Sequence, residues 1–216
     1  MVDLQMVDFH IHSQYSDGQA SVEEIARRAK ERGLKAIAIV DHSIELPFGL
    51  TEGKARMREI EIENASSLYG IKIFSGIECS INAAGEIVLP DFEFDFVIAS
   101  VHEYVYGEEY YRRVLSCIER YDVDVIGHPF SRLFGFDGRN ERLDEKMLDE
   151  VEELGVAIEL NSSHKSPPDE FLSICADRKI TYSIGSDSHT LSGVGEVGWS
   201  VEKAKRYMTR AKLFTP

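Results

Sequence analysis

Two histidines and an aspartate near the start of the chain have the spacing of a metal site. Residues Val7–Gly18 read VDFHIHSQYSDG, and over residues 7–12 apolar and polar residues alternate as they do in a strand. This alternation predicts that His10 and His12 lie on one face of the strand, with Asp17 in the turn that follows. Imidazoles and carboxylates together bind divalent transition metals. A polar strand end with an ordinary turn aspartate is the alternative, because histidine also has many structural uses.

Further histidines and carboxylates fall where other predicted strands end. The strand-end set comprises His10, His12, His42, Glu78, His102, His128, Asp187 and His189, and contains six of the seven histidines of the chain. The C-terminal ends of parallel strands in a barrel share one face, where active sites form. We therefore expect these side chains to converge, although any single histidine among them could instead cap a strand or bond a backbone carbonyl.

With Asp17 added, the potential ligands exceed the needs of one ion. A tetrahedral catalytic zinc uses about three protein ligands, so two or three ions are expected. Nitrogen and oxygen donors without thiolates favour Zn, Mn or Fe over Ca or a sulfur cluster. Neighbouring divalent ions generate hydroxide at neutral pH and hold the oxygens of a phosphoryl group during its displacement. A compact anion such as a phosphate ester is the expected substrate.

The elements that must position these residues alternate between strands and helices. Ser21 and Glu24 form the pattern of a capping box at the start of a helix. The apolar run at 36–40 has the composition of a strand that is buried on both faces. Strand followed by helix recurs about seven times, with a small hairpin expected at 79–89, and this order predicts a parallel sheet covered by helices. No linker interrupts it, so residues 1–216 are expected to form a single domain.

Composition narrows the functional class. The formal net charge of −14 argues against a broad surface for a nucleic-acid backbone, although a local cationic site made by metal ions would escape this argument. Cys79, Cys117 and Cys175 are scattered, which favours reduced thiols. No apolar run approaches the length of a membrane span, and no secretory signal precedes the first strand. We expect a cytoplasmic protein without a membrane partner, and the sequence leaves its oligomeric state open.

Taken in order, the motifs resemble those of the PHP (polymerase and histidinol phosphatase) superfamily. The resemblance rests on HIH with SDG at 10–18, VDH at 40–42, GIE at 76–78, SVH at 100–102, GHP at 127–129 and SDSH at 186–189. The strongest likeness is to the C-terminal PHP module of bacterial family X DNA polymerases, through the run GHPFSRLFG at 127–135 and the strand IELN at 158–161. The resemblance implies an α/β fold, a distorted seven-stranded (β/α) barrel of TIM-like form.

The resemblance also implies a site for three divalent ions. The first ion would be held by His10, His12, Glu78 and Asp187, the second by Glu78, His102 and His128, and the third by Asp17, His42 and His189. A hydroxide between the first two ions would be the nucleophile. The catalytic residues are then expected to be Glu78, Asp187 and Arg132.

The roles of several neighbouring residues are less determined. Arg132 follows a predicted ligand by four residues and could grip a phosphate bidentately, or it could be a surface arginine in a polar loop. Arg139 is a weaker candidate in the same loop. His164 matches no ligand motif, and we expect it at the surface or at the substrate rim. Asp8 and Asp41 are expected to bond the backbone or orient neighbouring histidines.

The leading functional hypothesis is a metal-dependent phosphoesterase that hydrolyses a small phosphomonoester. A 3′-to-5′ exonuclease acting on DNA ends is an alternative motivated by the family X likeness. A histidinol phosphatase is also possible, although nothing in the sequence selects histidinol. A catalytically idle metal-binding module is the third kind of hypothesis, against which stands the presence of a ligand at every expected position.

Overall fold

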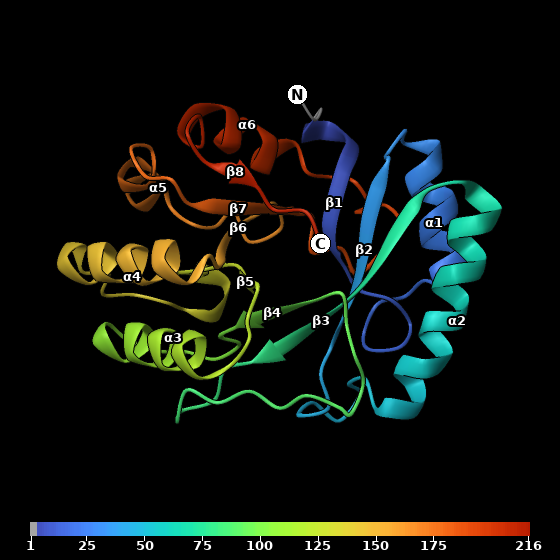
Figure 1. Ribbon diagram of the computed structural model, residues 1–216, viewed down its shortest axis with the longest axis horizontal. Coiled ribbons are helices and arrows are strands. Elements are labelled where there is room, and N and C mark those ends of the chain that lie inside the picture. Colours follow the sequence, from blue (N-terminus) through green and yellow to red (C-terminus); the bar gives the residue numbers. More distant parts are fainter. Residues whose placement is uncertain (1–3) are drawn as a thin grey trace.

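A computed structural model describes residues 4–216 as a parallel sheet with helices packed on its outer face (Figure 1). The strands are β1 (Val7–Ile11), β2 (Ala36–His42), β3 (Lys72–Ser80), β4 (Phe96–Ser100), β5 (Val125–Ile126), β6 (Ala157–Asn161), β7 (Thr181–Gly185) and β8 (Lys212–Leu213), in that spatial order. The helices are α1 (Val22–Glu31), α2 (Glu52–Tyr69), α3 (Glu108–Arg120), α4 (Glu141–Leu154), α5 (Asp169–Cys175) and α6 (Gly198–Tyr207), with short 3₁₀ turns η1 (Leu4–Met6) and η2 (Arg132–Phe134). The predicted α/β class is confirmed.

The expected count of seven strands is wrong by one. Strand β8 pairs with β7 through two residues only, which is too short for the sequence to show a period. The sheet curves into a half-barrel, and at its C-terminal rim an isolated parallel bridge joins Ile11 of β1 to Ser188. The amide of His12 donates to the carbonyl of Ser188 at 2.9 Å in the same place. This contact brings the end of β1 next to the segment after β7.

The expected hairpin at 79–89 is also absent from the described chain. Strand β3 continues through Ser80, and residues 82–86 form a turn in which the amide of Asn82 donates to the carbonyl of Glu86 at 2.9 Å. The segment beyond the turn leads to Pro90, which has no amide hydrogen to give to a second strand. By contrast, the capping box of Ser21 and Glu24 is present at the start of α1.

Alternation along the strands explains why polar residues gather at one rim. An apolar cluster fills the inside of the curved sheet, and it includes Ala38 and Val40 of β2 and Phe74 of β3. Side chains two residues apart share a face, so the same face of β2 next carries His42. On β3 the corresponding residue, two places beyond a glycine, is Glu78. Apolar packing thus closes one end of the interior and leaves its C-terminal rim to polar side chains.

Strand β1 reaches the same arrangement through a bulge. Val7 and Phe9 belong to the interior cluster, whereas Ile11 packs in the outer cluster beneath the helices. The register between β1 and β2 shifts by one residue between Asp8 and Ile11, and such an extra residue moves later side chains to the opposite face. The bulge is therefore what directs the two histidines of β1 into the interior, a feature that simple alternation did not predict.

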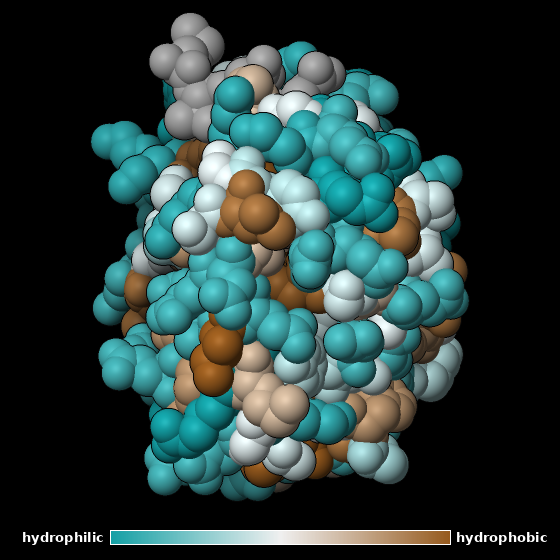
Figure 2. Space-filling model, turned by 90° about the vertical axis from the view of Figure 1, so that its right-hand side faces the viewer, coloured by the Kyte–Doolittle hydropathy of each residue, from teal (hydrophilic) through white to brown (hydrophobic). Residues whose placement is uncertain are grey.

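The outer face over α1 and α2 is mostly hydrophilic, with single apolar side chains scattered across it (Figure 2). These include Met57, Ile60 and Leu68 of α2. Within the described residues, none of the helices combines the length and apolar character needed to cross a membrane.

Candidate metal centre

The C-terminal rim of the sheet surrounds a cavity of about 330 Å³. It is lined by Asp17, His42, Leu46, Glu78, His102, His128, Phe134, His164, Asp187 and His189. His10 and His12 lie immediately beneath and are almost completely buried. The structure therefore brings all nine predicted ligand residues together, although they are spread over most of the sequence.

Glu78 lies at the centre of these side chains and faces them in two directions. Its Oε1 atom is 3.2 Å from Nε2 of His102 and 3.1 Å from Nε2 of His128. Its Oε2 atom is 3.5 Å from Nε2 of His10 and 3.6 Å from Nε2 of His12. Nδ1 of His42 is nearer still, at 3.0 Å from Oε2, so this one carboxylate lies beside five histidines and could serve them as a shared ligand.

Asp187 closes the first of these groups from the opposite side. Its Oδ1 atom is 3.2 Å from Nε2 of His12 and 3.9 Å from Nε2 of His10. The backbone of Asp187 has a φ of 55°, and that of His128 has a φ of 25°. Residues other than glycine rarely adopt positive φ, and such conformations concentrate at functional sites. Both residues are predicted ligands.

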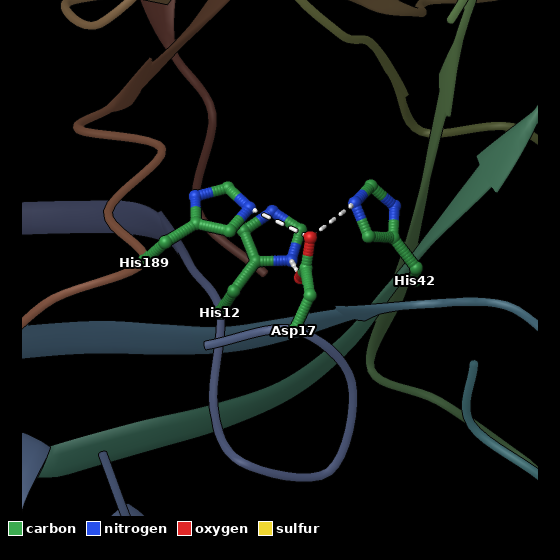
Figure 3. A group of neighbouring side chains, drawn as sticks. All are labelled: His12, Asp17, His42 and His189. Carbon is green, nitrogen blue, oxygen red and sulfur yellow. Dashed lines mark ion pairs between the residues drawn. The ribbon is translucent and has the colours of Figure 1, made fainter. Parts of the chain in front are cut away.

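The remaining predicted ligands meet at the outer edge of the cavity (Figure 3). Asp17, from the turn after β1, has its Oδ2 atom 3.3 Å from Nε2 of His189 and 3.6 Å from Nε2 of His42. Its Oδ1 atom is 3.6 Å from Nδ1 of His12, whose ring stacks on that of His189 at 4.1 Å. This group is more exposed than the two around Glu78.

The protonation chemistry of these groups fits divalent cations. Burial first, and then neighbouring histidines, lower the pKa of His12 to about 4, so its ring is neutral at pH 7, and its buried Nδ1 has no hydrogen-bond partner. Around His10, burial opposes protonation, but Glu159, Asp187 and Glu78 raise its pKa well above the usual value. Neutral imidazoles beside ionised carboxylates are the forms that bind metals. The raised pKa of His10 shows that the buried carboxylates around it favour positive charge, which divalent ions could supply in place of a proton.

Glu159 of β6 holds two of the predicted ligands in position. Its Oε1 atom accepts a hydrogen bond from Nδ1 of His10 at 2.7 Å, and its Oε2 atom accepts one from the backbone amide of His128 at 2.6 Å. Such outer contacts fix the tautomer and orientation of metal-binding histidines. Glu159 lies in the IELN motif at 158–161, but its residue type and spacing alone did not indicate this role.

Asp41 and Asp8 bond the backbone, as expected. Asp41 accepts hydrogen bonds from the amide of Ser13 at 2.8 Å and from the hydroxyl of Ser16 at 2.7 Å, and it pairs with the buried Arg58 at 2.9 Å. Asp41 therefore fixes the turn that carries Asp17 rather than a histidine ring.

Asp8 accepts hydrogen bonds from the amides of Ser186 and Gly195, both at 2.8 Å. These bonds tie strand β1 to the segment after β7, which carries Asp187.

His164 lies deeper than a surface position. Its Nε2 atom is 3.2 Å from Oδ2 of Asp187, and its ring stacks on His128 with centroids 4.4 Å apart. Its Nδ1 atom hydrogen bonds with the hydroxyl of Ser131 at 2.5 Å. All seven histidines therefore gather at this centre. The one sequence feature that could have indicated this is that His164 closely follows the end of β6, as other ligands follow their strands.

The two arginines of the loop after β5 are not among the residues that line the metal cavity. Arg132 is exposed and lines a neighbouring cavity, whereas Phe134 lines the metal cavity itself. Arg139 pairs through Nε with the buried Asp144 at 2.6 Å, which gives it a structural contact.

Comparison with known proteins agrees with this geometry. The model of the PHP domain family matches residues 8–163. A DNA polymerase/3′-5′ exonuclease PolX of Bacillus subtilis is 27% identical over 215 residues, which covers 95% of this chain but only 38% of the relative. A probable phosphatase of Aliivibrio fischeri is 29% identical, with 97% of this chain and 89% of the relative covered.

A solved structure shows the same fold. The crystal structure of histidinol phosphate phosphatase from Lactococcus lactis, complexed with Zn, L-histidinol and phosphate, superimposes with a TM-score of 0.68 at 21% identity. The match covers 96% of this chain and 94% of that one. On the family match and the fold, this chain belongs to the PHP domain family.

Proposed function

We propose that this chain is a metal-dependent phosphoesterase that hydrolyses a small phosphomonoester. The observation that carries the proposal is the carboxylate of Glu78, which presents one oxygen to His102 and His128 and the other to His10 and His12. A carboxylate between two groups of histidines is suited to hold two ions close together. The probable phosphatase of Aliivibrio fischeri, similar over almost its whole length, supports the same reaction class.

Three groups of side chains would hold the ions in this proposal. The first is His10, His12, Glu78 and Asp187, the second is Glu78, His102 and His128, and the third is Asp17, His42 and His189. Zn, Mn and Fe suit these donors. When bound, such ions supply a nucleophilic hydroxide at neutral pH and neutralise the phosphoryl oxygens.

The chain itself orients the reacting groups. Glu159 fixes the ring of His10 and the backbone of His128, and Asp41 fixes the turn that carries Asp17. Phe134 covers one side of the cavity, with its ring 5.4 Å from that of His128. The cavity of about 330 Å³ is large enough to accommodate a phosphate group. Arg132 would contact the rest of the substrate from the adjoining cavity.

Exonuclease activity on DNA 3′ ends is the second candidate. It is favoured by the similarity to PolX, of which this chain spans 38%. The formal net charge of −14 is unfavourable for it, because DNA binding depends on clustered cations. Hydrolysis of histidinol phosphate is a narrower version of the first candidate, and the Lactococcus lactis structure is what suggests it.

A direct assay distinguishes these activities. The purified chain, loaded separately with Zn, Mn or Fe, is incubated with p-nitrophenyl phosphate, histidinol phosphate and labelled single-stranded DNA. Release of phosphate from the esters without shortening of the DNA is the expected result. DNA shortening alone would select the exonuclease, and inactivity with every metal and substrate would support an idle metal-binding module.

A further inference from the structure

A second cavity of about 440 Å³ lies beside the metal cavity. His164 lines both of them, so one ring forms part of the wall between the two spaces. The cationic side chains and the tryptophan of the second cavity come from separate parts of the chain: Arg132 from η2, Lys165 from the loop after β6, and Trp199 and Lys203 from α6. A molecule that placed its phosphate in the metal cavity could extend past His164 into this space.

The cations of the second cavity outnumber the carboxylates that could neutralise them. Lys203 pairs with Asp169, and Glu170 lies 3.7 Å from Arg139, which is outside the cavity. Both carboxylates of the cavity therefore already face a cation. Within residues 4–216, Arg132 and Lys165 have no carboxylate within ion-pair distance, and both are exposed. In a chain with a net charge of −14, two such cations that line one cavity make a local place for an anion.

The other walls of this cavity are apolar. They are formed by Phe130, Pro167, Pro168 and the ring of Trp199. The ammonium group of Lys203 lies 5.5 Å from the centre of the Trp199 ring. Apolar walls with a few charged groups are typical of small-molecule sites, in which the charged groups fix the orientation of the ligand.

We propose that this second cavity binds the alcohol part of the substrate, and that this part carries an additional anionic group. The inference rests on the proposed phosphoesterase function and makes its substrate class narrower. Arg132 and Lys165 bind the second anion, which is a carboxylate or a phosphate, while the phosphoryl group that is cleaved occupies the metal cavity. A second negative charge of this kind is present both in a small diacid and in a nucleic-acid strand, where the next phosphate carries it.

The single tryptophan of the chain makes the second cavity observable without turnover. Trp199 is the only tryptophan, so its fluorescence reports on this cavity alone. The probes are phenylphosphonate and 4-carboxyphenylphosphonate, which resist hydrolysis and differ by one carboxylate. With the metal-loaded enzyme, we expect the carboxylated probe to bind about tenfold more tightly, as a charge-assisted contact worth about 1.5 kcal/mol would give.

A pair of matched variants tests the assignment of the cations. Lys165→Met is expected to weaken binding of the carboxylated probe by about tenfold and to leave phenylphosphonate binding within about twofold. Lys205→Met removes the same charge from an exposed position of α6 outside the cavity and is expected to change neither affinity. Equal affinities of the two probes for the unmodified enzyme would overturn the inference, as would equal weakening of both probes by Lys165→Met.

Failure of this inference and failure of the proposed function would give different experimental results. Hydrolysis of p-nitrophenyl phosphate with no preference for the carboxylated probe would remove the second subsite and leave the phosphoesterase proposal standing. No hydrolysis of any ester would remove the function itself. Competition between short single-stranded DNA and the carboxylated probe would identify the second anion as a nucleic-acid phosphate, whereas binding of the probe without such competition would identify a small diacid.

Discussion

Glu78 is the residue on which the centre depends most, because its two carboxylate oxygens lie beside five histidines. Its exposed fraction is 1%. Burial alone would raise the pKa of this carboxyl, but His102, His10 and His42 around it lower the pKa well below the usual value. A carboxylate in such surroundings remains ionised, and both of its oxygens stay available as ligands.

Glu78→Gln tests that arrangement. The amide keeps the shape but offers one oxygen and no charge, so we expect loss of at least one bound ion and a fall in phosphatase activity of more than about 100-fold, in the range of losing a metal ligand or its support. Metal content by mass spectrometry and hydrolysis of p-nitrophenyl phosphate are the measurements. Glu63→Gln on the exposed face of α2 is the control. Full metal content and activity in Glu78→Gln would contradict the proposed centre.

Glu159→Gln tests positioning rather than ligation. Glu159 accepts hydrogen bonds from His10, from the amide of His128 and from Asn161. A glutamine side chain would turn its NH₂ group toward at least one of these donors. We expect metal affinity to fall by about 10- to 100-fold, as for other outer-contact substitutions. Titration with metal while activity and fluorescence are recorded measures this. An unchanged metal affinity would show that Glu159 does not hold the ligands in place.

At the scale of elements, the closeness of β1, β6 and β7 keeps the ligands in register. Gly185 at the end of β7 leaves room for Glu159 and His10: a methyl group there would lie 2.4 Å from Oε1 of Glu159 and 2.6 Å from Cβ of His10. The close packing of β7 against His10 of β1 and against Glu159 of β6 thus depends on the absence of a side chain at Gly185. The geometry of the centre is therefore a property of strand packing as much as of ligand type.

Gly185→Ala is expected to weaken metal binding without altering any ligand. The added methyl group must displace Glu159 or His10, and overpacking of this kind costs roughly 1–3 kcal/mol of unfolding free energy. Thermal unfolding of the metal-free protein and a metal titration would measure the two effects. Gly53→Ala in α2, where a methyl group meets no atom within 4 Å, is the matched control and should not lower either value. Equal behaviour of the two variants would refute the packing argument.

The elements also show how far the sequence could predict this site. Their position at the ends of predicted strands led us to expect His42 and Glu78 at one rim, and both line the metal cavity there. The bulge in β1 was not predictable, since Val7, Phe9 and Ile11 are all apolar and suit either face. What decides it is the pairing with β2, which is a long-range contact.

Loops account for the other differences. The position of His164 depends on the side chain of Asn161, which accepts a hydrogen bond from the amide of His164 at 3.0 Å. The 3₁₀ turn η2 presents Phe134 to the metal cavity and Arg132 to the neighbouring one. Such turns are set by individual hydrogen bonds rather than by a period, so residue spacing alone could not assign these side chains to one cavity or the other.

At the scale of the whole molecule, negative charge is concentrated where metal ions would compensate it. The formal net charge is −14, and four carboxylates, Asp17, Glu78, Glu159 and Asp187, lie in or directly beside the metal cavity. Bringing them together in folding is unfavourable unless positive charge accompanies them, which the neighbouring histidines supply in part and metal ions would complete. Much of the stability of the folded chain should therefore depend on bound metal.

Removal of the metal tests this dependence. A ligand at 100 times its dissociation constant stabilises a folded protein by about 2.7 kcal/mol, which corresponds to a rise in Tm of roughly 5–10 °C for a chain of this size. We expect a chelator to lower Tm by about that much, and Zn or Mn to restore it, whereas Ca should not, because imidazole donors suit it poorly. Differential scanning calorimetry of the unmodified chain and of Glu78→Gln makes the comparison. The Tm of the variant should change less on addition of either chelator or metal, since its centre lacks the shared carboxylate. If the chelator left the Tm of the unmodified chain unchanged, the clustered carboxylates would be stabilised by the protein alone.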